Sequence, residues 1–516
     1  MAVILFYSWA AAQIVENAAN PQIQGIIVPG SLIRVSVQPS NGALPLLDPL
    51  VASVQIDGEQ AQITSVQGAS VVALVPSDVP LGPGTLVFKT ALNITAPVVQ
   101  VNVVARAFGL FTNSSGIGQA QAQNVVLGAV GPNNLLHPAH PGDLVRLSGT
   151  GLGTASQAQV VVMLGGHPAT VTSAGHSPSL PGMDVVDFQV PEDIAIPNGC
   201  FVAVQVIVDG AASNLASISK APEAAQMCLP PIDLTAAQMV QLDAGQQIPI
   251  VNFSIDGLAS VPPGSSGFLR NESFNVLAIQ TNEAGLAAMS PPLLADDAFY
   301  SCTSSTGGPI GAILAVGGSI DFGPSLTLTG PGTTGYILTS PGQSYYSLSL
   351  PTGPPVTSPD QLPPPYFVPG VWQISGPGAP PSPNAVLHYS ALPFQAQITS
   401  PPTIQLANYL NLQNIDRQKD LTVAWDPAGY GPGDVVSVNT GAAGIVSCRA
   451  RATDGRLSIP SSLLQTISTS ASSYFQISVT ARPDQTTRAD LTLQAGGDVP
   501  GKFTYTFTES FPTVFK

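Results

Sequence analysis

The chain has 516 residues, of which 44% are hydrophobic, 6% aromatic and only 9% charged, and Gly and Pro occur 50 times each. The apolar fraction is too high for a disordered chain, and helix breakers are too frequent for long helices, so the composition predicts three to five domains of short strands. The net charge of −15 argues against nucleic acid and against an anionic membrane surface as partners, because both require clustered Lys and Arg.

The N-terminal residues 1–12, MAVILFYSWAAA, form an apolar run that ends in the small residues Ala10, Ala11 and Ala12. This pattern is typical of a secretory signal peptide, although it lacks the basic residues that usually precede the apolar run. A first buried strand is the alternative. No other stretch approaches the roughly 18 uninterrupted apolar residues of a membrane helix. The sequence therefore predicts a secreted or cell-surface protein without a transmembrane segment.

A repeat in the first part of the chain decides the expected fold. Three pairs of segments resemble each other: 28–38 and 140–150, 53–65 and 161–173, and 71–90 and 185–206. In the middle pair, two alternating strands flank a turn around Gly58 or Gly166. Six or seven such strands in about a hundred residues are typical of an immunoglobulin-like sandwich. The sequence thus predicts an all-β protein with tandem Ig-like β-sandwiches and a β-rich C-terminal half.

The domain boundaries follow from shifts in composition. We expect a signal peptide at 1–12, a first sandwich at 13–106, a linker at 107–124, a second sandwich at 125–222, a β-rich domain with one short helix at 223–330, a Pro/Gly-rich β region at 331–399 and a C-terminal sandwich at 400–516. Residues 107–124 are rich in Gly, Ser and Gln, as linkers are. One short helix is expected at 234–245, with Thr235 as its N-cap and Gly245 beyond its end, and another within 458–468.

The segment PGDLVRLSGTGLG, residues 141–153, places Gly149, Gly151 and Gly153 directly after a strand-like run, as in loops that bind a pyrophosphate. Such a loop must open a helix whose N–H groups face the anion. Here a β-branched run leads into another strand, and position 154 is Thr where a dinucleotide fingerprint needs Gly. We therefore interpret the glycines as a strand end with positive φ angles and a bulge, and predict no phosphate site.

No other motif indicates catalysis or a bound metal. His137 and His140 have HxxH spacing, but prolines flank both, so we expect them in an exposed loop rather than on one helical face. The triplet Asp321–Gly323 lacks the other elements of a kinase and is interpreted as a turn, and the pair Asp296–Asp297 as a surface loop. No GxSxG motif occurs. The sequence predicts no enzyme, no catalytic residue, no cofactor and no metal site.

The four cysteines, Cys200, Cys228, Cys302 and Cys448, suit an exported protein with two disulfides, since none belongs to a CxxC pair. Cys200 starts a strand of the second sandwich, and Cys228 lies just after its last strand. A bridge between them would close a loop of about 29 residues and stabilise the domain by roughly 3–4 kcal/mol. Cys302 and Cys448 are then the remaining pair by elimination.

Several turn motifs of the second repeat match a known type of module. The pattern consists of the lead-in GLFT…GQ, the PGDLVRLSGTGLG segment, the hairpin GGHPATV and the closing VP…NG…V.V…SN. It resembles the IPT/TIG-type Ig-like modules of large secreted paralogue families of Acidobacteria, of the Solibacter type. The resemblance extends from about residue 107 onward, including DLTVAWDPAGYGPGDVVSVNT at 420–440. It implies an exported Ig-like protein and supplies no catalytic residues.

These observations leave three hypotheses about function. The first is a secreted or cell-surface, non-enzymatic protein of adhesion, matrix or envelope structure, whose partner is an extracellular polysaccharide or a cell-surface protein, or another copy paired through exposed sheet edges. The second is a carbohydrate-binding accessory protein of an extracellular polysaccharide-degrading system. It requires exposed aromatic side chains, for which the candidates are Trp372, Trp425, Tyr345, Tyr346 and Tyr366, although core positions are favoured for them. The third and least favoured is a hydrolase with a cleft between the C-terminal domains.

Overall fold

The computed structural model divides the chain into two compact units. It describes residues 12–38, 51–67, 70–90, 98–114, 116–126, 129–192, 196–232, 234–261, 267–289, 293, 302–305, 319–333, 335–339, 345–350, 353–357, 361–380, 388–441, 445–465, 467, 473–481, 491–492 and 498–516. The N-terminal unit comprises Met1–Leu229 with Ala287–Ala295, and the C-terminal unit comprises Pro230–Leu286 with Asp296–Lys516. The predicted signal peptide (except Ala12) and the pair Asp296–Asp297 lie outside the described residues.

The first sandwich of the N-terminal unit has eight strands. They are β1 (Ala12–Asn17), β2 (Ile26–Ile27), β3 (Leu32–Gln38), β4 (Val51–Ile56), β5 (Glu59–Gln67), β6 (Ser70–Leu74), β7 (Gly82–Thr90) and β8 (Val99–Val103). Their order is β1-β3-β6-β5-β4-β7-β8-β2. Strand β5 pairs with β6 on one side and β4 on the other, and its register shifts between Ile63 and Ser65, so it turns the corner between two layers. Val35, Val54 and Phe88 lie in the core between them.

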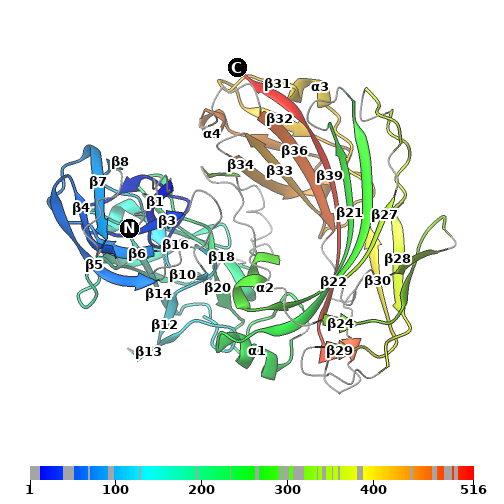
Figure 1. Ribbon diagram of the computed structural model, residues 1–516, viewed down its shortest axis with the longest axis horizontal. Coiled ribbons are helices and arrows are strands. Elements are labelled where there is room, and N and C mark those ends of the chain that lie inside the picture. The colour runs from blue at the N-terminus through cyan, green and yellow to red at the C-terminus, as the bar shows by residue number, and fades with distance from the viewer. Residues whose placement is uncertain are drawn as a thin grey trace, which may run out of the picture. The chain divides into compact units, whose positions relative to one another are not determined.

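The second sandwich repeats this arrangement with twelve strands. They are β9 (Gly109–Leu110), β10 (Thr112–Ser114), β11 (Ile117–Ala120), β12 (Ala122–Val126), β13 (Ala129–Pro132), β14 (Leu144–Thr150), β15 (Val160–Leu164), β16 (His167–His176), β17 (Asp184–Gln189), β18 (Gly199–Val208), β19 (Ala211–Ala212) and β20 (Ala216–Lys220). The corner strand is β16, whose register shifts between Val171 and Ser173, the position equivalent to that in β5. The predicted tandem all-β, Ig-like sandwiches are confirmed (Figure 1).

The predicted linker at 107–124 is wrong, because β9 to β12 belong to the second sandwich. Asn214, near the end of that sandwich, fastens the segment: its side chain accepts a hydrogen bond from the N–H of Leu110 at 2.8 Å and donates to the carbonyls of Leu110 and Gly116 at 3.0 and 2.9 Å. Gly, Ser and Gln therefore satisfy their backbone groups here by pairing within a sheet, although their composition is that of a flexible segment.

Buried hydrogen bonds join the two sandwiches into one unit. The side-chain amide of Asn17 donates to the carbonyls of Ala107 and Thr150 at 3.0 and 3.3 Å. The Thr150 hydroxyl accepts from the N–H of Leu32 at 2.8 Å and donates to the carbonyl of Gly182 at 2.6 Å. The first sandwich is thus attached to the strand end that carries the alternate glycines.

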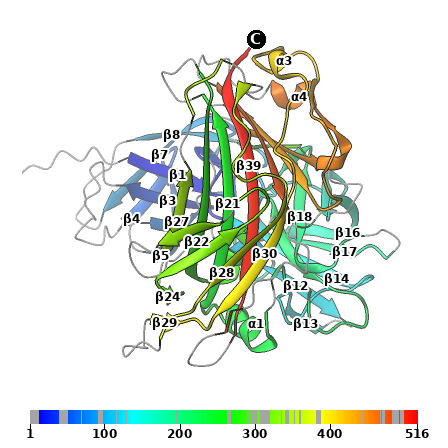
Figure 2. The ribbon, with the colours of Figure 1, turned by 90° about the vertical axis from the view of Figure 1, so that its right-hand side faces the viewer.

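The C-terminal unit is a larger sandwich. Its nine-stranded sheet has the order β23-β34-β33-β36-β39-β21-β22-β27, with β31 also pairing with β39. These strands are β21 (Ile248–Ser260), β22 (Leu269–Thr281), β23 (Cys302–Ser305), β27 (Tyr345–Leu350), β31 (Asn414–Ile415), β33 (Val435–Gly441), β34 (Ile445–Arg451), β36 (Ser473–Ala481) and β39 (Gly501–Phe515). Long strands β22, β21 and β39 run side by side in both ribbon views (Figures 1 and 2).

A four-stranded sheet and three strand pairs complete this unit. The sheet, ordered β26-β25-β28-β30, consists of β25 (Ser325–Thr329), β26 (Tyr336–Thr339), β28 (Gly370–Gly376) and β30 (Phe394–Ser400). The pairs are β24 (Ser319–Asp321) with β29 (His388–Ser390), β32 (Leu421–Ala424) with β35 (Arg456–Ile459), and β37 (Leu491–Thr492) with β38 (Asp498–Val499).

The three domains expected at 223–330, 331–399 and 400–516 share one core, so those boundaries are wrong. The ring of Phe253 lies 5.7 Å from that of Phe394 and 5.9 Å from that of Phe503, each from a different expected domain. The reason is long-range pairing: β21 is parallel to β39 along ten residues, which brings segments 250 residues apart into one sheet. The Pro-rich loops between them mark turns within this unit rather than domain limits.

The few helices are short. They are α1 (Ala236–Asp243), α2 (Glu283–Met289), α3 (Tyr409–Leu412) and α4 (Ser461–Leu464), with 3-10 turns at Gln157–Gln159 and Ala452–Asp454. Helix α1 is confirmed in detail, since the Thr235 hydroxyl accepts from the N–H of Gln238 and Gly245 has a φ of +72°. Helix α4 lies inside the expected range 458–468. Within the described residues, no helix has the length and apolar character needed to cross a bilayer.

Candidate functional site

Both disulfides are the ones that the sequence predicts. Cys200 and Cys228 are bonded, with their Cα atoms 4.9 Å apart, and connect the start of β18 to the segment after β20. Cys302 and Cys448 stand directly opposite each other in β23 and β34, with Cα atoms 4.1 Å apart. Each unit is therefore closed by one covalent bond, as is usual in exported domains.

The alternate glycines at 149–153 accommodate a neighbouring backbone and leave no room for an anion. Gly151 and Gly153 have φ angles of +94° and +61°, as predicted. A Cβ atom on either would overlap the carbonyl oxygen of Ala107 or Ala105, because the chain before β9 crosses here. Strand β14 pairs with β17 in unbroken register as far as Gly149 and ends at Thr150, so Gly151 and Gly153 lie beyond the paired strand.

The histidine motif lies in a loop, where each ring is bound by its surroundings. His137 Nδ1 lies 3.0 Å from Oδ1 of Asn134. His140 Nδ1 lies 3.2 Å from Oδ2 of Asp143, and its Nε2 lies 2.9 Å from the carbonyl of Ala225. Within the described part of the chain, no three His, Cys, Asp or Glu side chains converge on a metal site.

The aromatic candidates for sugar binding are mostly core residues. Trp372 and Trp425 are buried, and their indole N–H groups donate to the carbonyls of Val368 and Ala452 at 2.9 and 2.7 Å. Tyr346 is also buried, and its hydroxyl donates to the carbonyl of Gly323. Tyr366 is 42% exposed, and the Tyr345 side chain lies outside the described residues. Trp372, Trp425 and Tyr346 therefore occupy core positions, as the sequence favoured, and do not form an exposed aromatic face.

The outer face of the nine-stranded sheet instead carries small polar side chains, here called the polar face. Alternation along each strand places apolar residues such as Phe503, Tyr505 and Phe507 in the core and the residues between them outside. The polar face consists of Ser254, Asp256 and Ser260 of β21, Asn271, Ser273 and Asn275 of β22, Ser347 and Ser349 of β27, Ser437 and Asn439 of β33, Gln476, Ser478 and Thr480 of β36, and Thr504, Thr506, Thr508 and Ser510 of β39.

Cross-strand register aligns these side chains in rows. One row runs Ser349, Ser273, Asp256, Thr506 and Thr480, across five strands. The next runs from Asn271 through Leu258 and Thr508 to Ser478 and Ser437. Directly opposite side chains on one sheet face lie about 5 Å apart, so hydroxyl and amide groups follow one another at nearly regular intervals.

Hydrogen bonds orient the centre of the polar face around Asp256. Its Oδ2 accepts from the Ser254 hydroxyl at 2.7 Å and from the Asn275 amide at 3.3 Å. The Asn275 amide also donates to the Ser273 hydroxyl at 3.2 Å, and its carbonyl accepts from Ser347 at 2.9 Å. The side chain of Asp256 is exposed. Beside it is a hollow of about 450 Å³, which Asn271, Gln476, Thr506 and Thr508 also line.

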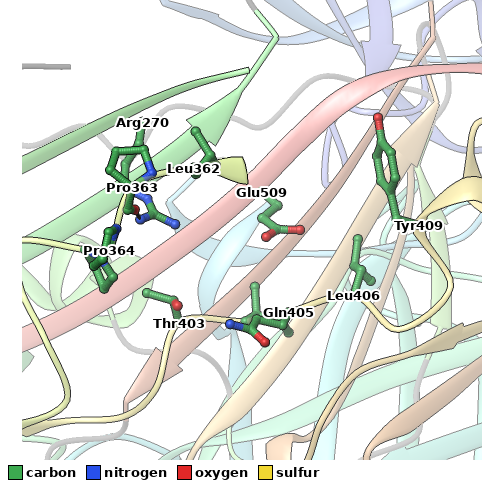
Figure 3. Close-up of a pocket in the computed structure, with 11 residues that line it drawn as sticks. Arg270, Leu362, Pro363, Pro364, Thr403, Gln405, Leu406, Tyr409 and Glu509 are labelled. Atoms are coloured by element: carbon green, nitrogen blue, oxygen red, sulfur yellow. Dashed lines mark hydrogen bonds between the residues drawn. The ribbon is translucent and has the colours of Figure 1, made fainter. Parts of the chain in front are cut away.

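The core-facing side of the same strands carries three buried charges. Arg270 and Glu509 flank Ala259 in one cross-strand row, and Glu272 follows Arg270 two residues along β22. Arg270 Nε lies 3.8 Å from Oε1 of Glu272, and its guanidinium carbon lies 5.5 Å from the centre of the Phe507 ring. Arg270 and Glu509 border a cavity of about 290 Å³ beneath the Pro363–Pro365 loop (Figure 3).

Burial shifts the pKa values of Arg270 and Glu272 in this cluster. Loss of hydration raises the pKa of Glu272, although hydrogen bonds from the N–H groups of Phe367 and Tyr366 and the charge of Arg270 oppose the shift. Burial also lowers the pKa of Arg270, against the attraction of Glu272 and Glu509. The arrangement therefore consists of one cation between two carboxylates, in a site from which water is largely excluded.

No protein-family model matches the chain, and no curated protein matches it. Among solved structures, SGBP-B from the mixed-linkage glucan utilization locus of Bacteroides ovatus is 13% identical, with 38% of this chain and 45% of that chain covered and a TM-score of 0.20. Immunoglobulin domains 1–4 of Sidekick-1 are 11% identical (97% and 99% covered, TM-score 0.13), and the bacterial integrin-binding protein invasin is 11% identical (96% and 79%, TM-score 0.14). The chain spans less than half the length of SGBP-B. Likenesses with TM-scores this low carry no conclusion about this chain.

Proposed function

We propose that this protein is a secreted or cell-surface, non-enzymatic protein of adhesion, matrix or envelope structure, and that its polar face binds a neutral extracellular polysaccharide. Two disulfides support export, because such bonds persist in oxidising compartments. The resemblance of the sequence from about residue 107 onward to secreted Ig-like modules supports the same proposal.

The observation that carries the proposal is the composition of the polar face. Serine, threonine, asparagine and glutamine both donate and accept hydrogen bonds, as sugar hydroxyls do. Asp256 is the one ionisable residue in the central rows of the face, and Arg449 of β34 lies opposite Ser437 at its edge, so a neutral chain meets little charge beside the hollow. The hollow beside Asp256 has the size of a small-ligand pocket, and the aligned rows continue beyond it across neighbouring strands.

The residues that line the hollow do not suit catalysis of glycoside hydrolysis. Hydrolysis of a glycosidic bond generally requires two carboxyl groups facing each other across it. Of the two acidic residues that line the hollow, Asp256 points outward, whereas the carboxylate of Glu272 accepts a hydrogen bond from Phe367 on the core side of the sheet. The described residues around the hollow include no histidine. We therefore expect retention of a polysaccharide without its cleavage.

The test is affinity electrophoresis of the full-length protein in gels that contain neutral glucans, mannans, xylans or galactans. We expect at least one polymer to slow migration, and Asp256→Ala or Thr506→Val to weaken that binding about tenfold, the loss expected for one or two hydrogen bonds. Thr327→Val, on the outer side of the four-stranded sheet, is the matched control and should bind normally. Normal binding by both polar-face variants, or no retardation by any polymer, would contradict the proposal.

A further inference from the structure

The cavity beneath the Pro363–Pro365 loop is separate from the polar face, since it opens on the opposite side of β22, β21 and β39. Its walls combine apolar side chains with two opposite charges. In Figure 3, Arg270 stands with the proline loop at one end, Leu406 and Tyr409 stand at the other, and Glu509 lies between them. The Arg270 side chain is 10% exposed and Glu509 is 5% exposed. Both charges are therefore held away from bulk water.

Contacts on the far side of Arg270 fix its orientation. One Nη atom donates to the carbonyl of Pro363, Nε faces Glu272, and the guanidinium lies over the ring of Phe507. Within the described part of the chain, Pro363 is the only hydrogen-bond acceptor of the guanidinium. A guanidinium carries five N–H donors, so donors remain for a ligand in the cavity.

In the cross-strand row, Ala259 of β21 separates the two charges. Neighbouring strands lie about 4.8 Å apart, so the backbones of β22 and β39 are about 10 Å apart across β21. Arg270 and Glu509 extend from these outer strands, and both side chains line the same cavity.

We infer that this cavity binds a small zwitterion, an α-amino acid with an apolar side chain, with its carboxylate at Arg270 and its ammonium at Glu509. Arginine and carboxylate groups match in geometry and form strong charge-assisted hydrogen bonds. Each charge of the ligand would meet an opposite charge that is already buried, so neither is left unpaired on binding. The apolar side chain of the ligand would lie against Leu406, Ile404 and Tyr409. A volume of about 290 Å³ suits one amino acid.

Calorimetric titration of the full-length, disulfide-bonded protein with four probes tests this inference. We expect saturable binding of L-phenylalanine and L-leucine, and binding at least tenfold weaker for N-acetyl-L-phenylalanine, which lacks the ammonium, and for L-phenylalaninamide, which lacks the carboxylate. If the amide binds as tightly as the free amino acid, the cavity recognises a cation only and the zwitterion assignment is overturned. It is equally overturned if neither free amino acid saturates the protein at millimolar concentration.

Glu509→Gln tests the residue assignment, because it removes the charge and keeps the size of the side chain. We expect it to weaken binding of L-phenylalanine at least tenfold. The control is Glu59→Gln, which neutralises an exposed carboxylate in the N-terminal unit and should bind normally. Unchanged binding by folded Glu509→Gln overturns the inference. If circular dichroism shows that this variant does not fold, the two blocked ligands decide the question on the unmodified protein.

Discussion

Some glycines in this protein are needed for a turn, and others are needed because another backbone segment passes too close to leave room for a side chain. At Gly151 and Gly153, positive φ angles coincide with carbonyl oxygens of the preceding segment where a side chain would be. Gly210 has a similar φ of +83°, but nothing lies within 4 Å of the position of a Cβ atom. The two kinds of glycine look alike in the sequence and differ in what they permit.

This difference predicts unequal effects of alanine at the two kinds of position. Gly210→Ala should destabilise the N-terminal unit by about 1 kcal/mol, the cost of a side chain in the left-handed region. Gly151→Ala adds steric overlap with the Ala107 carbonyl and should cost about 2–4 kcal/mol in total. Urea unfolding followed by circular dichroism measures both. Equal losses would mean that the crossing segment simply moves away.

At the scale of elements, local sequence patterns were sufficient to predict the hairpins but not to predict which distant strands pair with each other. Strands β4–β5 and β15–β16 join through Asp57–Gly58 and Gly165–Gly166, whose positive φ angles at both positions are those of the tight turns that the repeat predicts. The pairing of β9 could not be predicted, since it depends on Asn214, about a hundred residues later.

The candidate site shows the same limit. The alternation in GKFTYTFTES at 501–510 predicts a strand with aromatic residues on one face, and this is confirmed for β39. The rows of the polar face arise only because β39 lies parallel to β21 and antiparallel to β36. No local signal encodes that neighbourhood. The same holds for Arg270 and Glu509, which line one cavity although they are far apart in the chain.

The segment around Phe367 is fastened to β22 by Glu272, and this attachment predicts a pH dependence. Because burial raises the pKa of Glu272 above 4.5, the native state binds its proton more tightly than the unfolded chain does. The contribution to stability is therefore fully present below pH 4.5 and is lost as the pH rises through the raised native value. We expect Glu272→Gln, which retains a hydrogen-bond acceptor for Phe367, to abolish this component.

Tryptophan fluorescence can follow this effect in the C-terminal unit, because Trp372 and Trp425 are both in its core. Urea unfolding at pH 5 and pH 7 should show a smaller drop in unfolding free energy with rising pH for Glu272→Gln than for the unmodified protein. Asp434→Asn is a useful comparison, because burial raises the pKa of Asp434 too. We expect this variant to lose its own part of the pH dependence and to keep the part that comes from Glu272. An identical pH dependence with and without Glu272 would refute the assignment.

At the scale of the whole molecule, the order of the chain and the division into units do not coincide. The N-terminal unit comprises residues up to Leu229 and also the later segment Ala287–Ala295. Between these two segments the chain contributes α1, β21 and β22 to the C-terminal unit. Leu293 bridges to Val202 of β18: its N–H donates to the carbonyl of Phe201 at 2.7 Å, and its carbonyl accepts from Ala203 at 2.9 Å. The N-terminal unit is thus completed by residues that come late in the chain.

This return predicts that a change at Leu293 affects the distant β18. Leu293→Pro removes the N–H that donates to the Phe201 carbonyl and should lower the unfolding free energy of the N-terminal unit by about 1–3 kcal/mol, the cost of leaving a buried carbonyl without its donor. Leu293→Ala keeps the backbone pairing and is the control. Hydrogen exchange should be at least tenfold faster at the Ala203 amide in the proline variant. It should be unchanged at Val206, whose amide donates to Ser213 in the same strand region. Equal protection of Ala203 in all three proteins would mean that β18 is complete without the returning segment.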